Sequence, residues 1–169
     1  MLKSFLKVAF IIVFILIVRS GEALSAKSMP WIPLLLFNNE IVPYTYATIQ
    51  EAIDAATNGD QIIVAPGTYE ENIDFKGKAI TVKSAEGPEV TIIDGGGAGS
   101  VVTFSSGEGR NSVIEGFTIT NGTGTANPDP TDPNIDHGGG GILCFSSSPT
   151  IKNNRIDTCT ANYVAGILS

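Results

Sequence analysis

Three carboxylates lie close together in one Pro-rich segment of the sequence, residues 127–137. They are Asp129, Asp132 and Asp136, and carboxylate oxygens are the ligands that Ca²⁺ prefers. Their spacing departs from that of an EF-hand loop, which needs a set ligand order and a central Gly. The segment therefore predicts one of two things, a calcium site at these three residues or a solvated acidic loop, and the spacing favours the loop.

One histidine, His137, follows these carboxylates and is the only histidine in the chain. A mechanism that needs an imidazole as acid or base therefore has one candidate. His137 precedes four glycines, which is typical of a solvent-exposed loop residue. The glycine runs at residues 95–97 and 138–141 lack the following helix that a phosphate-binding loop requires. We therefore predict no catalytic residue and no cofactor apart from the calcium candidate.

The composition is that of an all-β protein interrupted by glycines. Hydrophobic residues make up 43% of the chain, charged residues only 16%, and there are 19 glycines. The formal net charge of −7 would repel a phosphate backbone, so nucleic acid is not expected as a partner.

The N-terminus has the pattern of an export signal. Lys3 and Lys7 precede an apolar run at residues 8–18, which is too short to span a bilayer. Small residues follow and allow cleavage after Ala23 or Ala26. Residues 1–26 are therefore predicted to be a signal peptide, which implies a secreted or cell-surface protein, extracellular or periplasmic, with no transmembrane span after cleavage. An uncleaved membrane anchor is the alternative, because Arg19 directly follows the run.

Two cysteines, Cys144 and Cys159, would meet an oxidising compartment after export and could pair there. They follow different predicted strands and are expected on different sides of one structural unit. Buried free thiols are therefore favoured over a disulfide.

A repeated pattern organises the C-terminal half of the chain. Residues 112–120 are echoed by residues 149–157, with Gly116 and Asn153 at the same place. Gly and Asn enter the left-handed backbone region at least cost, so each copy reads as strand, bend, strand. A second echo, residues 139–143 against 165–168, recurs at a spacing typical of solenoids. We expect stacked coils in which Ile114 lies next to Ile151 and Ile119 next to Ile156.

One helix is predicted ahead of these coils, at residues 48–58. Thr48 and Glu51 form a capping-box pattern, apolar residues follow at helical spacing, and Asn58-Gly59 provides a stop. We expect this helix to cover the open end of the apolar interior. Residues 27–43 are predicted to be a linker or edge segment, and residues 44–169 to form the coils. The expected strands are short and lie at residues 62–64, 80–83, 90–94, 101–104, 113–120, 142–145, 150–156 and 166–168.

The helix and the strand that follows it, residues 48–56 and 63–73, resemble the opening of right-handed parallel β-helix proteins of the pectin lyase-like superfamily. They are also similar to the start of pectin methylesterases. The later Gly-Gly-Gly-Ile, Ser-Pro-Thr-Ile and Asn-Asn-x-Ile elements resemble the repeats of large secreted β-helix proteins. The resemblance implies an all-β, right-handed parallel β-helix solenoid with one N-terminal capping α-helix.

The catalytic motifs of the proteins that this chain resembles are not present in its sequence. Glu115, Arg155 and Asp157 do not reproduce the Gln, two Asp and Arg of the esterases, and neither an Asp-Asp pair nor a Gly-His-Gly triplet of the related hydrolases occurs. Residues 135–137 are similar to a Trp-Ile-Asp-His motif of pectate lyases, but the Trp is missing. The charged residues of the first coils are expected to form a solvated face (Glu70, Glu71, Asp74, Lys76, Lys78 and Lys83).

Two functional classes follow from this pattern. The first is an exported repeat module with a structural or polysaccharide-binding role, whose partner would be a polysaccharide or cell-surface glycan and whose binding residues the sequence does not assign. The second is the N-terminal part of a polysaccharide lyase, hydrolase or pectin esterase with its catalytic coils beyond this chain. Either way, the repeats are expected to continue into further coils. The missing catalytic cluster favours the module.

Overall fold

The computed structural model describes residues 39–126, 137–161 and 167–168 of the 169-residue chain, all within the compact unit Phe37–Ser169. The predicted signal peptide at residues 1–26 and the calcium candidates Asp129, Asp132 and Asp136 lie outside the described residues. In the part of the chain that is described, no helix is long and apolar enough to cross a membrane.

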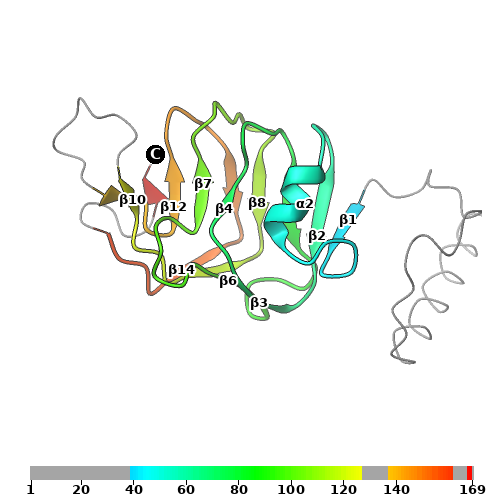
Figure 1. Cartoon of the computed structure of the whole chain (residues 1–169), viewed down its shortest axis with the longest axis horizontal. Helices are drawn as coiled ribbons and strands as arrows, with labels where there is room; N and C mark the ends of the chain where they lie inside the picture. The colour runs from blue at the N-terminus through cyan, green and yellow to red at the C-terminus, as the bar shows by residue number, and fades with distance from the viewer. Residues whose placement is uncertain (1–38, 127–136, 162–166, 169) are drawn as a thin grey trace, which may run out of the picture. The chain divides into compact units, whose positions relative to one another are not determined.

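Three parallel sheets make up the unit (Figure 1). The one we name sheet A consists of β1 (Asn39–Val42), β2 (Gln61–Val64), β5 (Thr81–Ser84), β8 (Val113–Glu115) and β13 (Thr150–Lys152). Sheet B consists of β3 (Gly67–Glu70), β6 (Thr91–Asp94), β9 (Thr118–Thr120) and β14 (Arg155–Asp157). Sheet C consists of β4 (Ile73–Asp74), β7 (Val102–Phe104), β12 (Ile142–Cys144) and β15 (Ile167–Leu168).

The chain visits sheets A, B and C in turn and then begins the next coil, so each strand pairs with its equivalent one coil away. Every strand pair in the three sheets is parallel. The described residues hold one antiparallel pair, β10 (Thr125–Ala126) with β11 (His137–Gly138). The predicted all-β parallel β-helix with one helix is confirmed.

The aligned bends of the repeat are also confirmed. Gly116 has φ 81° and Asn153 has φ 56°, both in the left-handed region. These bends split the predicted strands at residues 113–120 and 150–156 into two strands each, one in sheet A and one in sheet B. Ile114 pairs in register with Ile151, and Ile119 with Ile156.

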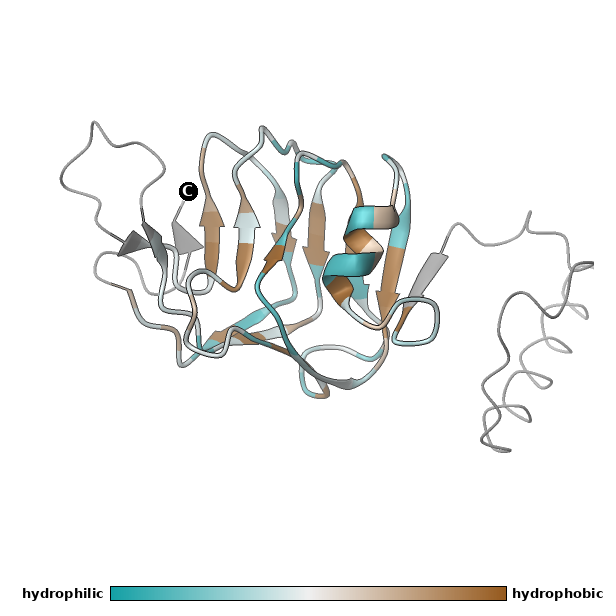
Figure 2. Cartoon of the chain, in the orientation of Figure 1, coloured by the Kyte–Doolittle hydropathy of each residue, from teal (hydrophilic) through white to brown (hydrophobic). Residues whose placement is uncertain are grey.

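Inward-facing residues stack into apolar columns between the sheets. Burial alternates along the strands, as in β2, where Ile62 and Val64 are buried and their neighbours are less so. Phe75 and Phe104 stack with their ring centroids 4.3 Å apart. Figure 2 shows the apolar segments on the strands and the mixed character of α2, whose residues Ile49, Ala52 and Ile53 belong to the core.

Helix α2 (Ile49–Ala55) packs against β1, β2 and β4 and buries Ile49, Ala52 and Ile53. The N-terminus is the predicted one, because the Thr48 side chain accepts a hydrogen bond from the Glu51 N–H at 3.1 Å. The reciprocal bond differs from the predicted capping box, since Glu51 accepts from the Ala47 N–H. The helix thus lies over the first strands of sheets A and C, as expected of a cap.

The predicted C-terminus of this helix, at Asn58-Gly59, is wrong. The helix ends at Ala55, and Ala56 is already extended, with ψ 153°. The reason is a long-range contact: the Lys78 ammonium donates to the carbonyls of Ile53, Asp54 and Ala56 at 2.7 to 2.8 Å. These carbonyls are satisfied without the glycine turn that usually ends a helix.

A second charge that was expected to be solvated also binds the helix. The Glu71 carboxylate accepts hydrogen bonds from the Ile49 and Gln50 N–H groups at 2.9 and 3.0 Å. Two charges therefore hold opposite ends of α2, an anion at the N-terminus and a cation at the C-terminus, which is the favourable arrangement for the helix dipole. The expectation of a plain solvated face is wrong for Glu71 and Lys78.

A buried carboxylate links the corners of successive coils. Glu108 is 2% exposed and accepts hydrogen bonds from the Gly77 N–H, the Ser106 N–H and the Ser147 hydroxyl at 2.7 to 2.8 Å. Burial by itself would raise the pKa of Glu108, but these hydrogen bonds outweigh it and the pKa lies below its ordinary value.

The two cysteines are both free thiols. Cys144 is buried, and burial raises its pKa to about 11. Cys159 is half-buried and its pKa is also raised, mainly by burial. Both thiols are therefore in the unreactive protonated form near neutral pH.

Candidate functional site

Polar residues end all four strands of sheet B. Glu70, Asp94, Thr120 and Asp157 occupy one register position in four successive coils. Because the strands are parallel, their carboxyl ends meet at the same edge, about 4.8 Å apart from coil to coil. Their side chains alternate with the inward-facing column and point away from the core.

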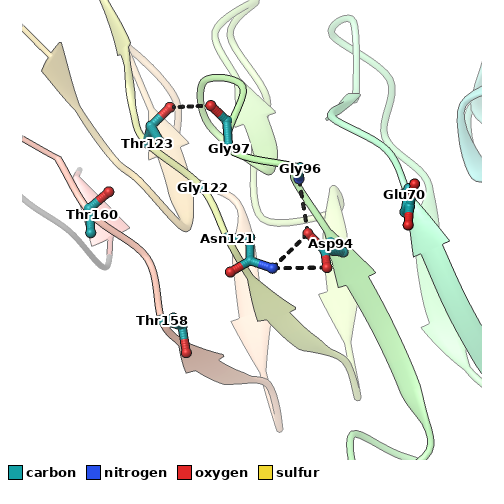
Figure 3. A pocket seen from close by; sticks show the side chains of 9 residues that line it. All are labelled: Glu70, Asp94, Gly96, Gly97, Asn121, Gly122, Thr123, Thr158 and Thr160. Atoms are coloured by element: carbon teal, nitrogen blue, oxygen red, sulfur yellow. Dashed lines mark hydrogen bonds between the residues drawn. The ribbon is translucent and has the colours of Figure 1, made fainter.

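A groove of about 540 Å³ lies along this edge. Carboxylates, an amide and hydroxyls line it, and three glycines complete the wall (Figure 3). The side chains involved are those of Glu70, Asp94, Asn121, Thr123, Thr158 and Thr160. They come from the ends of β3 and β6 and from the corners that follow β9 and β14, so the groove forms only when four coils are stacked.

Asp94 is held in place at the centre of the groove. Its carboxylate accepts a hydrogen bond from the Gly96 N–H at 2.9 Å, and both of its oxygens accept from the Asn121 amide at 3.0 and 2.9 Å (Figure 3). Asn121 lies one residue after β9 with φ 57°, a conformation that Asn tolerates well. The amide thereby bridges two coils and fixes the orientation of the carboxylate.

The corners after β6 and β9 are stacked in the same way. The Thr123 hydroxyl accepts from the Gly99 N–H at 2.9 Å and donates to the Gly97 carbonyl at 3.2 Å. A Cβ atom at Gly122 would overlap the carbonyl of Gly140, so this position requires glycine for close approach. The floor and walls of the groove are therefore preorganised by contacts within the protein.

Two groups in the groove remain available to a ligand. Within the described residues, neither the Glu70 carboxylate nor the Thr160 hydroxyl makes a hydrogen bond or an ion pair to another side chain or to the backbone. Both residues are exposed. A carboxylate accepts hydrogen bonds only, whereas a hydroxyl both donates and accepts, so the pair suits a ligand with hydroxyl groups.

Thr158 adds backbone strain to the same groove. It follows β14 as Asn121 follows β9, and its φ is 51°. A β-branched residue in the left-handed region costs on the order of 1–3 kcal/mol. Strain of this kind is concentrated at functional sites, which supports a role for this edge.

The residues that line the groove do not include Glu115, Arg155 or Asp157. The calcium candidates Asp129, Asp132 and Asp136 lie outside the described residues. His137 lies in β11, and its side chain is outside what the structure describes. Glu115 is bound by Lys83 and Lys152 at 3.6 and 3.1 Å on sheet A. In the described parts of the chain, no group of three or more His, Cys, Asp or Glu residues is placed to hold a metal ion.

A family model described as "Protein of unknown function (DUF1565)" matches residues 72–167, more than half of the chain. The chain belongs to this family. The matched region runs from the corner before β4 to β15, so it contains the repeats and every groove residue except Glu70. Membership in DUF1565 agrees with the β-helix repeat structure. Neither a curated protein nor a solved structure matches the chain.

Proposed function

We propose that this chain is an exported β-helix repeat module that binds a polysaccharide or a cell-surface glycan through the groove at the edge of sheet B. One observation carries this proposal: an orderly row of carboxylate, amide and hydroxyl groups that follows the stacking direction. Such groups bind sugar hydroxyls, and preorganised polar groups in a cavity favour a specific ligand. The resemblance to the pectin lyase-like superfamily supports a carbohydrate partner.

Binding to immobilised and soluble glycans tests the proposal. The chain without residues 1–26 is titrated against oligosaccharides by calorimetry, and the variants Glu70→Ala and Thr160→Ala are compared with it. Each variant is expected to weaken binding about tenfold, the loss of one hydrogen bond to a ligand. Glu89→Ala is the matched control, because Glu89 is an exposed carboxylate outside the groove. Equal affinity in all four proteins would refute the groove as the site.

Export is tested separately through the N-terminus of the mature protein. The apolar run and the small residues after it support cleavage after Ala23 or Ala26. Mass spectrometry of the protein recovered outside the cytoplasm is expected to show one of these two N-termini. Retention of Met1 in the exported protein would support a membrane anchor instead.

A catalytic role on polysaccharide is the second candidate, and the resemblance of residues 48–56 and 63–73 to pectin-active proteins is what favours it. We expect residues 27–169 not to cleave pectate, even with added calcium. β-Elimination needs a base and a cation close together, and no Lys or Arg is among the residues that line the groove. Absorbance of new unsaturated uronic-acid ends would contradict this expectation.

A further inference from the structure

The charge of the groove is set by two neighbouring carboxylates. Glu70 and Asp94 are register partners in β3 and β6, and both line the cavity. Adjacent parallel strands are about 4.8 Å apart, so two like charges occupy successive coils at the same edge. Like charges directly opposite each other are unfavourable in a sheet.

The cations that form ion pairs in the described residues bind carboxylates other than Glu70 and Asp94. Arg155 binds Asp157 at 2.8 Å, and Lys83 and Lys152 bind Glu115 on sheet A. Among the described residues, neither Glu70 nor Asp94 has a Lys or Arg partner. The groove therefore presents a negative potential to an approaching ligand.

The carboxylates of Glu70 and Asp94 differ in the hydrogen bonds that they already accept from the protein. Asp94 is already compensated by the Gly96 N–H and the Asn121 amide. Within the described residues, Glu70 has no such donors, so its carboxylate is free to accept a hydrogen bond from a ligand. The hydrogen bonds to Asp94 come from neutral groups, so the carboxylate keeps its negative charge. The hydroxyls of Thr123, Thr158 and Thr160 complete a lining suited to uncharged polar groups.

We infer that the groove takes polyhydroxylated glycans that carry no carboxylate and rejects uronic-acid polymers. The inference depends on the proposed function, because it names the class of glycan that the same groove takes. A uronate carboxylate placed along this edge would lie near Glu70 or Asp94 and be repelled. At low ionic strength, one such contact in a solvent-exposed site lowers affinity about fivefold.

The test compares two panels of oligosaccharides with the chain lacking residues 1–26, in EDTA so that calcium cannot bridge carboxylates. Neutral probes are oligomers of glucan, xylan, mannan and galactan, and acidic probes are oligomers of galacturonate and alginate. A chitosan oligomer is the cationic probe. We expect a neutral probe to bind at least tenfold more tightly than any acidic probe, and chitosan to bind no more weakly than the neutral probes because the groove is negative.

The variant Glu70→Gln isolates the electrostatic cause. It is expected to raise the ratio of acidic to neutral affinity about fivefold in dilute buffer, and 0.5 M salt should remove this gain because it screens the repulsion. Glu89→Gln, the matched control, should leave the ratio unchanged.

The outcomes separate this inference from the proposed function. If an acidic probe binds most tightly, the glycan-binding function stands and the rejection of uronic-acid polymers is overturned. An unchanged ratio in Glu70→Gln also overturns it. If no probe in any panel binds, the proposed function fails and the inference fails with it.

Discussion

Left-handed backbone at the coil bends restricts which residues can occupy these positions. Gly116 and Asn153 turn the chain from sheet A to sheet B in successive coils, with φ 81° and 56°. Asn153 also donates a long hydrogen bond, 3.4 Å, to Glu115. The conformation and the side-chain contact can be separated by substitution.

The variant Asn153→Val is expected to destabilise the protein by roughly 1–3 kcal/mol, because a β-branched residue tolerates positive φ poorly. Asn153→Gly should have little effect, since glycine adopts this conformation freely. Urea unfolding monitored by circular dichroism measures the free energy of unfolding of both variants. Equal damage from Gly and Val would mean that the side-chain contact, and not the backbone, is what the position requires.

The bend at residue 153 was predictable because Asn and Gly occupy equivalent places in an echoed pattern. The strain at Thr158 was not, because threonine gives no local signal for a left-handed conformation. Its φ of 51° follows from its position after β14, in the place that Asn121 takes after β9. The left-handed conformation of such a residue is recognised only when equivalent positions in successive coils are compared.

Glu108 makes the stability of the fold depend on pH. Its pKa is below the ordinary value of 4.5, because hydrogen bonds from Gly77, Ser106 and Ser147 favour the charged form more than burial disfavours it. A lowered folded-state pKa adds stability that is fully present above the unfolded-state value and is lost as the pH falls through the folded-state value. We therefore expect the free energy of unfolding to decrease as the pH is lowered below about 4.5.

The variant Glu108→Gln tests this contribution. Its amide nitrogen would face an N–H donor or the Ser147 hydroxyl, and an unsatisfied buried group costs about 1–3 kcal/mol. The variant should be less stable than the parent at pH 7, and the difference should shrink at pH 3 to 4. A difference that stays constant between these pH values would show that Glu108 does not titrate on unfolding in this range.

Helix α2 depends on contacts from the first coil. The Lys78 ammonium is bound to three carbonyls at the C-terminus of the helix. Lys76, two residues away, makes an ion pair with Asp54 in which both side chains are about half exposed. The two lysines are close in sequence but differ in environment.

We expect Lys78→Met to cost roughly 1–3 kcal/mol, because it leaves several partly buried carbonyls without a donor. Lys76→Met is the matched control and should cost less than about 1 kcal/mol, as is usual for exposed ion pairs. Thermal unfolding of both variants measures the difference. Similar losses for the two would contradict the role of Lys78 in ending the helix.

The start of this helix could be predicted and its end could not. Thr48 and Glu51 lie within one turn, so the N-terminal signal is local. Lys78 and Glu71 reach the helix from more than 20 residues away, and no local pattern shows such a contact. The expectation that these charges were only solvated failed for the same reason.

Apolar columns run through the whole molecule, and their residues differ in how many neighbouring coils support them. Ile114 is fully buried and pairs with Val82 on one side and Ile151 on the other. Ile151 is only partly buried, and within the described residues its one register partner is Ile114. In a stack of this kind, stability is the sum of contacts between neighbouring coils.

Ile114→Ala is therefore expected to cost about 2–5 kcal/mol, the usual range for a fully buried residue. Ile151→Ala should cost less than half as much as Ile114→Ala. Chemical denaturation of the two variants measures which one loses more free energy of unfolding. A larger loss for Ile151 would mean that the last described coil is better packed than its exposure indicates.

The coil architecture was predictable at this scale, because strand length, bend residues and the helix each leave a pattern in the sequence. The groove was not, because its residues are contributed by four strands, and a register is needed to bring Glu70 next to Asp94. Asp129, Asp132 and Asp136 form a cluster in the sequence. The groove is a cluster only in space.

The corners between sheets B and C differ in length from coil to coil. The first consists of residues 71–72, the second of residues 95–101, and the third is long enough to contain β10 and β11. The strands on either side keep their register in all of these coils. Insertions and deletions at this corner are therefore compatible with the fold, and the same corner borders the groove. One scaffold of three sheets therefore supports corners of different length and shape beside the same row of strand ends.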